Sequence, residues 1–313
     1  MTENIEITTL VVAILAGAVR RGTPMALAAL GETLAEKSGI INLGVEGMML
    51  VGAMVAVAVQ VATGNPLLAA VAAGCAAGCI AAIHAVLVIR LNVNQIVSGF
   101  ALTVLGTGVS GFLGREYIGV KIQSVPVWDI PCLSNIPVIG DIFFRHDPFV
   151  YGSVILAAVL WLLMFRTRFG LNVRAVGEDP KSAYAQGISV GSTRALAVII
   201  GGFLAGVGGA QLSLAYVGLW SEQMTAGQGW IAIGLVVVAG WHPMRCLLVS
   251  WLFGALLVLH PHLQAAGIPV SPYLVAMLPY VLAIVALTLA TLALQRRGYG
   301  LPAALSKQFR IER

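Results

Sequence analysis

The chain has 313 residues, of which 59% are hydrophobic and 10% are charged, whereas about 25% of the residues of an average soluble domain are charged. This composition excludes a soluble domain and predicts an integral membrane protein built from helices, because the apolar runs are long and rich in Ala, Leu and Val. The 18 basic residues outnumber the 13 acidic ones, but they flank apolar runs instead of forming a basic face. They therefore indicate membrane topology rather than a nucleic-acid partner.

Nine apolar runs approach the roughly 20 residues that a helix needs to cross the hydrocarbon core. A further run, 7–19, is short for a crossing, and we expect it to lie in the membrane interface as an entry helix. We predict an all-α, polytopic membrane protein with about 9 to 10 transmembrane helices. The nine predicted spans are 21–37, 40–63, 67–89, 95–114, 149–165, 195–218, 225–241, 246–262 and 273–294.

Basic residues in the loops predict how the helices are oriented, because Lys and Arg accumulate on the cytoplasmic side. Nine spans and a cytoplasmic C-terminus place the N-terminus outside; insertion of 7–19 would move it inside and change nothing downstream. We treat residues 1–313 as one transmembrane domain with a long outer loop at 115–148 and a long inner loop at 166–194. In this orientation the basic residues left outside are Arg20, Arg21, Arg115, Lys121 and Arg145.

Two polar side chains, Asn42 and Glu46, lie in the otherwise apolar second run, among several glycines. An ionisable residue at membrane depth costs at least about 2.5 kcal/mol, so it faces a bundle interior or a water-filled path rather than lipid. Glu46 is therefore the first candidate for a pathway residue. The alternative is a structural carboxylate bound to the terminus of a neighbouring helix.

A second glycine-rich stretch with polar residues, 224–234, follows the sixth span as the Glu46 stretch follows the first. Spans one to four and six to nine run in opposite directions around the fifth, and such inverted repeats place a transporter's site near the membrane midplane. The polar groups suit a neutral solute such as a sugar or nucleoside. Hydrogen bonding between helices is the alternative for Asn94, Gln95 and Gln228. The predicted pathway residues are Asn42, Glu46, Asn94, Gln95, Gln228 and Trp230.

The two long loops differ in character. The outer loop is rich in proline, and we expect a folded surface cap. The inner loop is the most polar stretch of the chain. Asp179 as N-cap, Pro180 at the first helical position and Gly187 as the stop predict a short helix outside the bilayer. We expect this helix to contact another protein; a merely solvated loop is the alternative.

The chain lacks the motifs of an enzyme. It contains no Gly-x-x-x-x-Gly-Lys-Ser/Thr loop for ATP phosphates, no Gly-x-Ser-x-Gly elbow and no His-Glu-x-x-His zinc motif. The four cysteines fall in no metal-binding spacing. We therefore expect a conduit without catalytic residues, metal or cofactor of its own.

Four motifs give the chain a resemblance to a known family. They are Glu36-Lys-Ser-Gly-Ile-Ile-Asn-Leu-Gly-Val-Glu-Gly-Met-Met-Leu50, the pair Arg166-Thr-Arg-Phe-Gly-Leu and Arg174-Ala-Val-Gly-Glu-Asp-Pro-Lys181, Met224-Thr-Ala-Gly-Gln-Gly-Trp-Ile-Ala232, and Pro302-Ala-Ala-Leu305. Over nearly its whole length the sequence resembles the nucleoside-type branch of the ribose and branched-chain amino-acid ABC importer permeases. It looks like the shorter of the two paired permeases of such a system. Trp230, where relatives more often carry Phe, and the proline-rich outer loop depart from the pattern.

The resemblance implies a BtuC-like importer fold in the bacterial inner membrane and import of nucleosides. It also implies a cytoplasmic ATPase subunit that binds ATP and Mg, a second permease chain, and an extracytoplasmic substrate-binding protein or lipoprotein. Simple sugars of the ribose type, or a secondary transporter driven by an ion gradient, are the alternatives. The inner loop would carry the coupling helix that docks into the ATPase, with the candidate residues Arg174, Glu178, Asp179, Pro180, Lys181, Tyr184 and Gly187.

Overall fold

The structure is a computed structural model that describes residues 2–265, 271–297, 302–305 and 307. It is a bundle of α-helices with two short π-helical turns, η1 and η3, a 3-10 turn, η2, and one small hairpin in which β1 and β2 pair antiparallel. The elements in chain order are α1 (Thr2–Lys37), α2 (Val45–Thr63), α3 (Pro66–Ala85), η1 (Val86–Arg90), α4 (Gln95–Gly114), η2 (Arg115–Tyr117), β1 (Trp128–Asp129), α5 (Ile139–Phe143), β2 (Arg145–His146), α6 (Pro148–Arg166), α7 (Arg168–Glu178), α8 (Pro180–Ala185), α9 (Val190–Ala210), η3 (Gln211–Val217), α10 (Gln228–Val238), α11 (Pro243–Ala265) and α12 (Pro272–Arg297).

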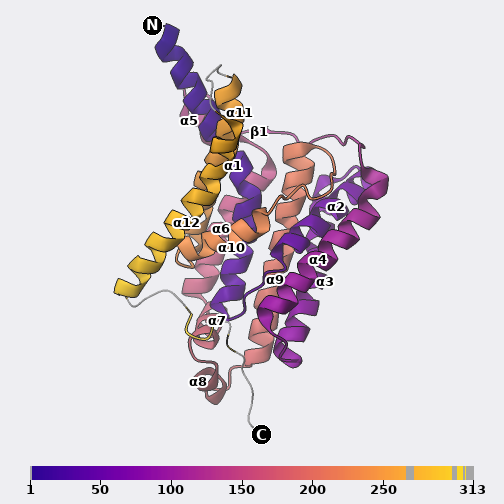
Figure 1. The fold of residues 1–313 in the computed structure, drawn as a ribbon, viewed down its shortest axis with the longest axis vertical. Helices are drawn as coiled ribbons and strands as arrows, with labels where there is room; N and C mark the ends of the chain where they lie inside the picture. The colour runs from indigo at the N-terminus through magenta and orange to yellow at the C-terminus, as the bar shows by residue number, and fades with distance from the viewer. Residues whose placement is uncertain (1, 266–270, 298–301, 306, 308–313) are drawn as a thin grey trace.

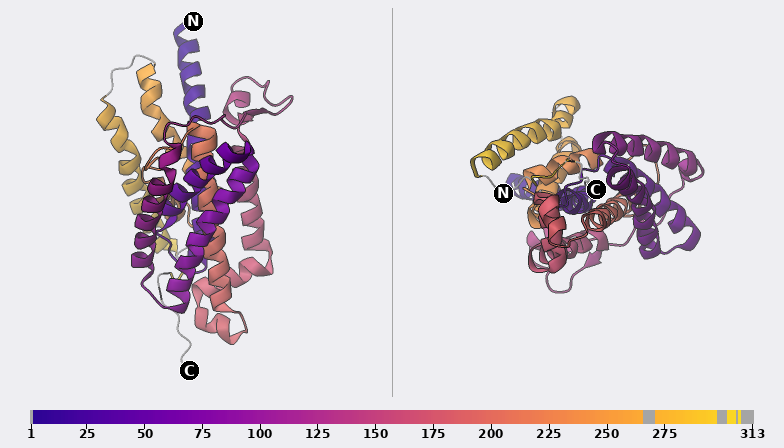
Figure 2. Two further views of the ribbon diagram at one scale, coloured as in Figure 1. Left: turned by 90° about the vertical axis from the view of Figure 1, so that its right-hand side faces the viewer. Right: turned by 90° about the horizontal axis from the view of Figure 1, so that it is seen from below.

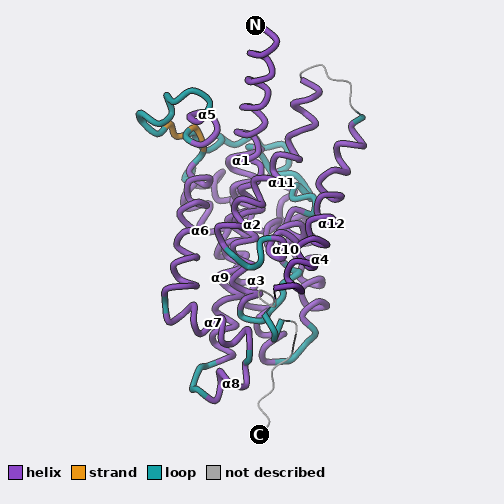
Figure 3. The backbone as a smooth tube through the Cα atoms, turned by 90° about the vertical axis from the view of Figure 1, so that its left-hand side faces the viewer, coloured by secondary structure: helices purple, strands orange, loops and turns teal. Residues whose placement is uncertain are grey.

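The helices run mostly along the long axis of the molecule, with the N-terminus at one end and α7 and α8 at the other (Figure 1). The segment that carries α5 and the hairpin projects sideways at the N-terminal end, beyond α6 (Figure 3). We call this segment, residues 115–147, the outer cap, and we call α7 with α8, after the role that the sequence predicts for them, the coupling unit. The two long loops thus lie at opposite ends of the bundle, as the predicted topology requires.

Within the described residues, seven helices are long and apolar enough to cross a membrane. Two predictions were wrong. Residues 7–19 do not form a separate interfacial helix, because they continue without a break into the next run as α1, whose apolar part is Thr8–Lys37. The predicted span 225–241 is only the 11-residue helix α10, about 16 Å long and thus half of a crossing. The apolar part counted within α12, Met277–Leu289, is also shorter than a crossing.

Most helix starts follow from local sequence. The side chains of Asn65 and Asp147 accept hydrogen bonds from the first backbone N–H groups of α3 and α6, and each is followed by proline at the first helical position. Asp179 and Pro180 begin α8 in the same way, so the predicted short helix is confirmed. The amphipathic helix α7 before it was missed; Thr167 caps it.

Small residues hold the centre of the bundle together, where α1, α2 and α9 meet. A Cβ atom at Gly31 of α1 would overlap the carbonyl of Gly201 on α9, and one at Gly52 of α2 would overlap the carbonyl of Gly206. Such backbone contact supplies the van der Waals packing that holds helices together in lipid. Seen from the inner end, α9 lies inside the bundle with α3 and α4 on one side and α12 on the periphery (Figure 2).

Candidate solute pathway and coupling surface

Glu46 lies in the first turn of α2, 6% exposed, and points at the start of α10. One carboxylate oxygen accepts hydrogen bonds from the Thr225 hydroxyl (2.5 Å) and the Gly227 N–H (2.8 Å), and the other accepts one from the Gly229 N–H (2.7 Å). The N-terminus of a helix favours a negative charge through its free N–H groups and its dipole. The carboxylate is therefore bound to a helix terminus in the way that the structural alternative described.

A cavity of about 560 Å³ opens beside this contact, between α2, α4 and the segment that precedes α10. Two half-exposed aromatic side chains, Phe100 from α4 and Trp230 from α10, lie on its wall. A neighbouring cavity of about 220 Å³ shares part of that wall and continues to Arg115 and Glu222 at the outer end. The larger cavity is lined by Glu46, Leu50, Phe100, Thr103, Val104, Thr107, Gly108, Gln223, Ala226, Gly227 and Trp230.

The chain between α1 and α2, residues 38–44, leaves the helical conformation inside the bundle. Side chains from other helices bind its backbone. The Ile41 N–H donates to Gln95 (2.9 Å) and the Ile41 carbonyl lies 3.1 Å from a ring nitrogen of His84. Irregular backbone at membrane depth is tolerated where protein groups satisfy it. We call this segment the first break.

Further hydrogen bonds satisfy backbone groups of the first break. The Asn42 N–H donates to Glu32 (2.8 Å), Arg194 donates to the Ser38 carbonyl (3.0 Å), and Thr103 donates to the Leu43 carbonyl (2.8 Å). Sequence reasoning did not select His84 or Arg194 as pathway residues, because each is an isolated polar residue whose partner in the first break lies more than 40 positions away.

The predicted pathway residues fall into different places. Glu46 and Trp230 line the same cavity. The side chain of Asn42 is buried and binds the Gly44 N–H and Met48. Asn94 is exposed and caps α4, and Gln95 binds the first break. Gln228 is 2% exposed, and among the described residues its side-chain polar atoms have no hydrogen-bond partner.

The coupling unit is a folded element rather than a solvated loop. Val176 of α7, Ala183 of α8 and Val190 of α9 form one buried cluster. Gly187 ends the turn after α8 with φ +82°, a conformation that favours glycine. Among the candidate contact residues, Lys181 and Tyr184 are exposed, whereas Arg174 turns back over the ring of Phe165, 5.3 Å from its centroid.

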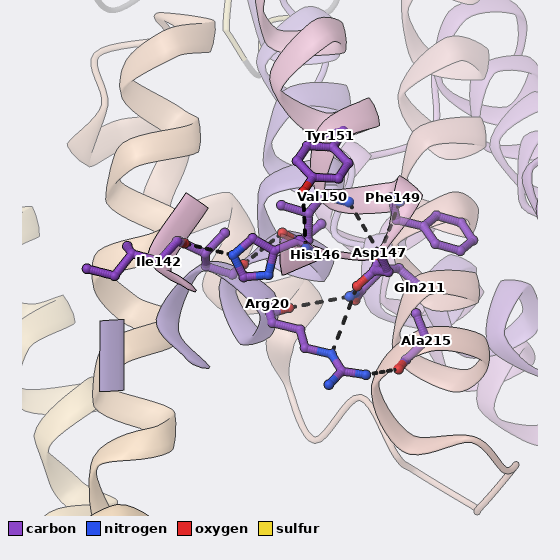
Figure 4. A network of polar contacts seen from close by, with 11 residues as sticks. Arg20, Ile142, His146, Asp147, Phe149, Val150, Tyr151, Gln211 and Ala215 are labelled. Atoms are coloured by element: carbon purple, nitrogen blue, oxygen red, sulfur yellow. Dashed lines mark hydrogen bonds and ion pairs between the residues drawn. The ribbon is translucent and has the colours of Figure 1, made fainter. Parts of the chain in front are cut away.

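At the outer end, a polar cluster joins α1, η3 and the outer cap (Figure 4). Arg20 lies 3.9 Å from the fully buried Asp147 and donates to the Ala215 carbonyl, while Gln211 donates to the Arg20 carbonyl (3.3 Å). Asp147 also caps α6. Burial raises the pKa of the Asp147 carboxyl, and burial lowers the pKa of the neighbouring His146. The cluster anchors the cap to the bundle.

Comparison with known proteins identifies the family of the chain. Residues 14–287 match the family model of the permease component of branched-chain amino acid transport systems. The chain belongs to this family. It is the permease subunit of an ABC transporter and a multi-pass protein of the plasma membrane, which removes the basis for a transporter driven by an ion gradient.

Three curated relatives have names that specify solutes. A putative glucose ABC transporter permease of Haloferax volcanii is 43% identical over 81% of this chain and 78% of its own length. The nucleoside permease NupC of Lactococcus lactis is 34% identical over 74% and 77%. The guanosine permease NupQ of Bacillus subtilis is 33% identical over 82% and 86%. No solved structure matches the chain, so the BtuC-like fold and the inverted repeat remain predictions.

Proposed function

We propose that this permease imports nucleosides, and that the cavity beside Glu46 is part of their path. The observation that carries the proposal is the pairing of two exposed aromatic rings, Phe100 and Trp230, with hydroxyl and amide groups on the same wall. Aromatic rings stack on a nucleobase, and such stacking contributes about 1–3 kcal/mol per base. Thr103, Thr107 and Gln223 offer hydrogen bonds to a ribose.

Glu46 contributes to this site by shaping it. Its oxygens are bound by Thr225, Gly227 and Gly229, which fixes the segment before α10 as one wall of the cavity. We place the solute against the aromatic rings and not on the carboxylate. A neutral solute fits this arrangement, because the negative charge is already compensated by the start of α10.

The path is incomplete in a single chain. Phe100 is 55% exposed and Trp230 is 46% exposed, and the outward face of α4 carries further exposed apolar side chains such as Val104 and Leu105. A second permease chain that covers this face would close the cavity. We propose this chain as a partner, together with an extracytoplasmic binding protein that delivers the solute.

We further propose that ATP binding and hydrolysis in a cytoplasmic ATPase subunit drive import through α8. This helix lies at the inner end of the molecule (Figure 1), and its residues Lys181 and Tyr184 are exposed. The small cluster of Val176, Ala183 and Val190 joins α8 to α7 and α9. A displacement of α8 is thereby passed to α9, which contacts both α1 and α2 through glycines.

Import of a simple sugar is the second candidate, since the glucose permease of Haloferax volcanii is 43% identical to this chain. The test is uptake of radiolabelled guanosine in host cells that lack the gene and carry it on a plasmid. We expect uptake to depend on the gene, to be reduced by unlabelled adenosine, and to be unaffected by excess glucose or ribose. Competition by glucose but not by adenosine would reverse the assignment.

A pair of variants tests the site itself. Phe100→Ala removes one ring from the cavity wall, and we expect the KM for guanosine to rise about tenfold with little change in the maximal rate, as loss of about 1.4 kcal/mol of binding predicts. Leu162→Ala, at an exposed position of α6 outside the cavity lining and away from α4, is the matched control. An unchanged KM in Phe100→Ala would remove that residue from the site.

A further inference from the structure

The C-terminal segment 302–305 folds back onto the coupling unit. The Ala304 N–H donates to the Gly177 carbonyl (2.9 Å), and the Ala303 N–H lies 3.4 Å from a carboxylate oxygen of Glu178. Ala304 is 3% exposed, and a turn closes the segment on itself. These contacts join positions more than 120 residues apart in the chain, and none of the motifs assigned above explains them.

The segment supplies an end cap that α7 lacks. The last carbonyl groups of a helix have no partner within the helix, and Gly177 is the last residue but one of α7. An acidic residue at the C-terminal end of a helix is also unfavourable, because the dipole is negative there, yet Glu178 occupies that end. The N–H groups of Ala303 and Ala304 satisfy both the carbonyl and the carboxylate.

The same segment lies at the inner end of α1. A Cβ atom at Gly177 would overlap the Lys37 carbonyl, and a Cβ atom at Gly39 would lie 3.3 Å from the Ala304 carbonyl. Leu305 packs against the main core. The segment therefore occupies the junction of α7 with the first break, where the backbone leaves α1.

We propose that segment 302–305 is a brace that holds the coupling unit against the first break, so that displacement of α8 moves the inner end of α1 as well as α9. The inference rests on the coupling role proposed above for α8. Without the brace, α7 remains attached through α6 and α9, and the chain folds and inserts, but only the direct contact of Gly177 with the Lys37 carbonyl still links α7 to α1, and α1 follows α7 less closely. The expected defect is uncoupling: ATP is hydrolysed with less import.

The test is the ratio of solute imported to ATP hydrolysed in proteoliposomes that contain the complete transporter. Ala304→Pro removes the N–H that binds Gly177, and a stop codon in place of Leu301 removes the brace; a stop codon in place of Gln308, which keeps it, is the matched control. We expect the ratio to fall at least fivefold in the first two and to stay at the wild-type value in the control.

A wild-type ratio in Ala304→Pro, with normal insertion, would overturn the brace. If the stop at Leu301 prevents insertion, Ala304→Pro decides the question, since it removes the N–H that binds the Gly177 carbonyl. The ratio is measured with whichever solute the wild-type complex imports. A wild-type complex that imports sugar and no nucleoside would thus contradict the proposed substrate and leave the brace testable.

Discussion

The segment before α10, residues 218–227, is a second non-helical interruption of the bundle, and we call it the second break. The two breaks are held in place in different ways. Both precede a helix in the bundle interior. In the first break, only Gly39 has a positive φ, and side chains of α1, α3, α4 and α9 bind its backbone. In the second, Gly218, Gln223, Ala226 and Gly227 all have positive φ.

The first break is thus held by many side-chain contacts, whereas the second break contains strained backbone. Non-glycine residues with positive φ, such as Gln223 and Ala226, store about 1–3 kcal/mol each and persist where surrounding contacts hold them. The three hydrogen bonds to Glu46 come from this second break and from the start of α10. We infer that the first break turns as a rigid pivot together with the inner end of α1, and that the second break is the wall whose own contacts rearrange during transport when the Glu46 contact is made and broken.

The largest effect is expected from Glu46→Ala, which releases the second break. A hydrogen bond to a charged group contributes about 1.5–3 kcal/mol, so loss of all three lowers import about 1000-fold or more. Glu46→Gln keeps an acceptor for Thr225 and Gly227 but turns an amide NH₂ toward the Gly229 N–H, and we expect an intermediate loss of import. The measurement is guanosine uptake normalised to the amount of permease in the membrane. Normal uptake in Glu46→Ala would show that this contact has no role in import.

A variant in the first break should lower stability rather than alter transport. His84 is fully buried and its ring binds Ser98 and the Ile41 carbonyl, so His84→Ala leaves a cavity and unpaired polar groups. We expect a loss of about 2–4 kcal/mol of stability, seen as a lower thermal unfolding midpoint in detergent. Import per folded molecule should be retained. A large fall in import by fully folded His84→Ala would show that the contacts of the first break also rearrange during transport.

Sequence reasoning anticipated what local chemistry determines. The apolar runs located most of the helices, and the Asp179, Pro180 and Gly187 pattern located α8. Contacts between helices that are far apart in the sequence could not be predicted in this way. Nothing near Glu46 indicates that Thr225 and Gly229, about 180 positions away, bind it.

The two wrong predictions have the same origin. Run length alone could not show that α10 stops at half a crossing, because apolar residues continue past its end at Val238. Similarly, Arg20 and Arg21 suggested an end to the first run, but Arg20 has partners in Asp147 and Ala215 that keep it inside the bundle at the outer end. The helix therefore continues through both residues.

A smaller effect is expected at the coupling unit. The Asp179 carboxylate caps α8 and binds the Ser182 hydroxyl, and this hydrogen bond lowers the pKa of Asp179. The folded pKa lies below the unfolded one, so the cap is fully formed above the unfolded pKa and is lost only as the pH falls through the folded pKa. Asp179→Asn retains an N-cap without the charge, whereas Asp179→Ala removes both. We expect import to fall in Asp179→Ala and to be largely retained in Asp179→Asn. An equal loss of import in both variants would indicate a charge contact with the ATPase instead of a cap.

The smallest effect is expected in the outer cap. Burial lowers the pKa of His146 below its ordinary value of 6.5, although the hydrogen bond to the Ile142 carbonyl offsets part of the shift. Protonation is then favoured in the unfolded state, so this contribution to stability is complete above pH 6.5 and is lost as the pH falls below it. We expect the unfolding midpoint to drop by about 2 °C or less between pH 7.5 and pH 5.5, and the His146→Asn variant to lose this part of the pH dependence. An equal drop of the unfolding midpoint in His146→Asn would show that other groups cause this pH dependence.

The claim that the second break rearranges while the first keeps its internal contacts is tested most directly by thiol labelling in the complete transporter. Cysteine is placed at Ala226, on the cavity wall, or at Ile41 in the first break, in a background without the exposed Cys75, Cys79 and Cys132. We predict that the labelling rate at Ala226→Cys changes severalfold between the ATP-bound and nucleotide-free ATPase, and that the rate at Ile41→Cys does not. Equal changes at both positions, or a change at Ile41→Cys alone, would contradict the account.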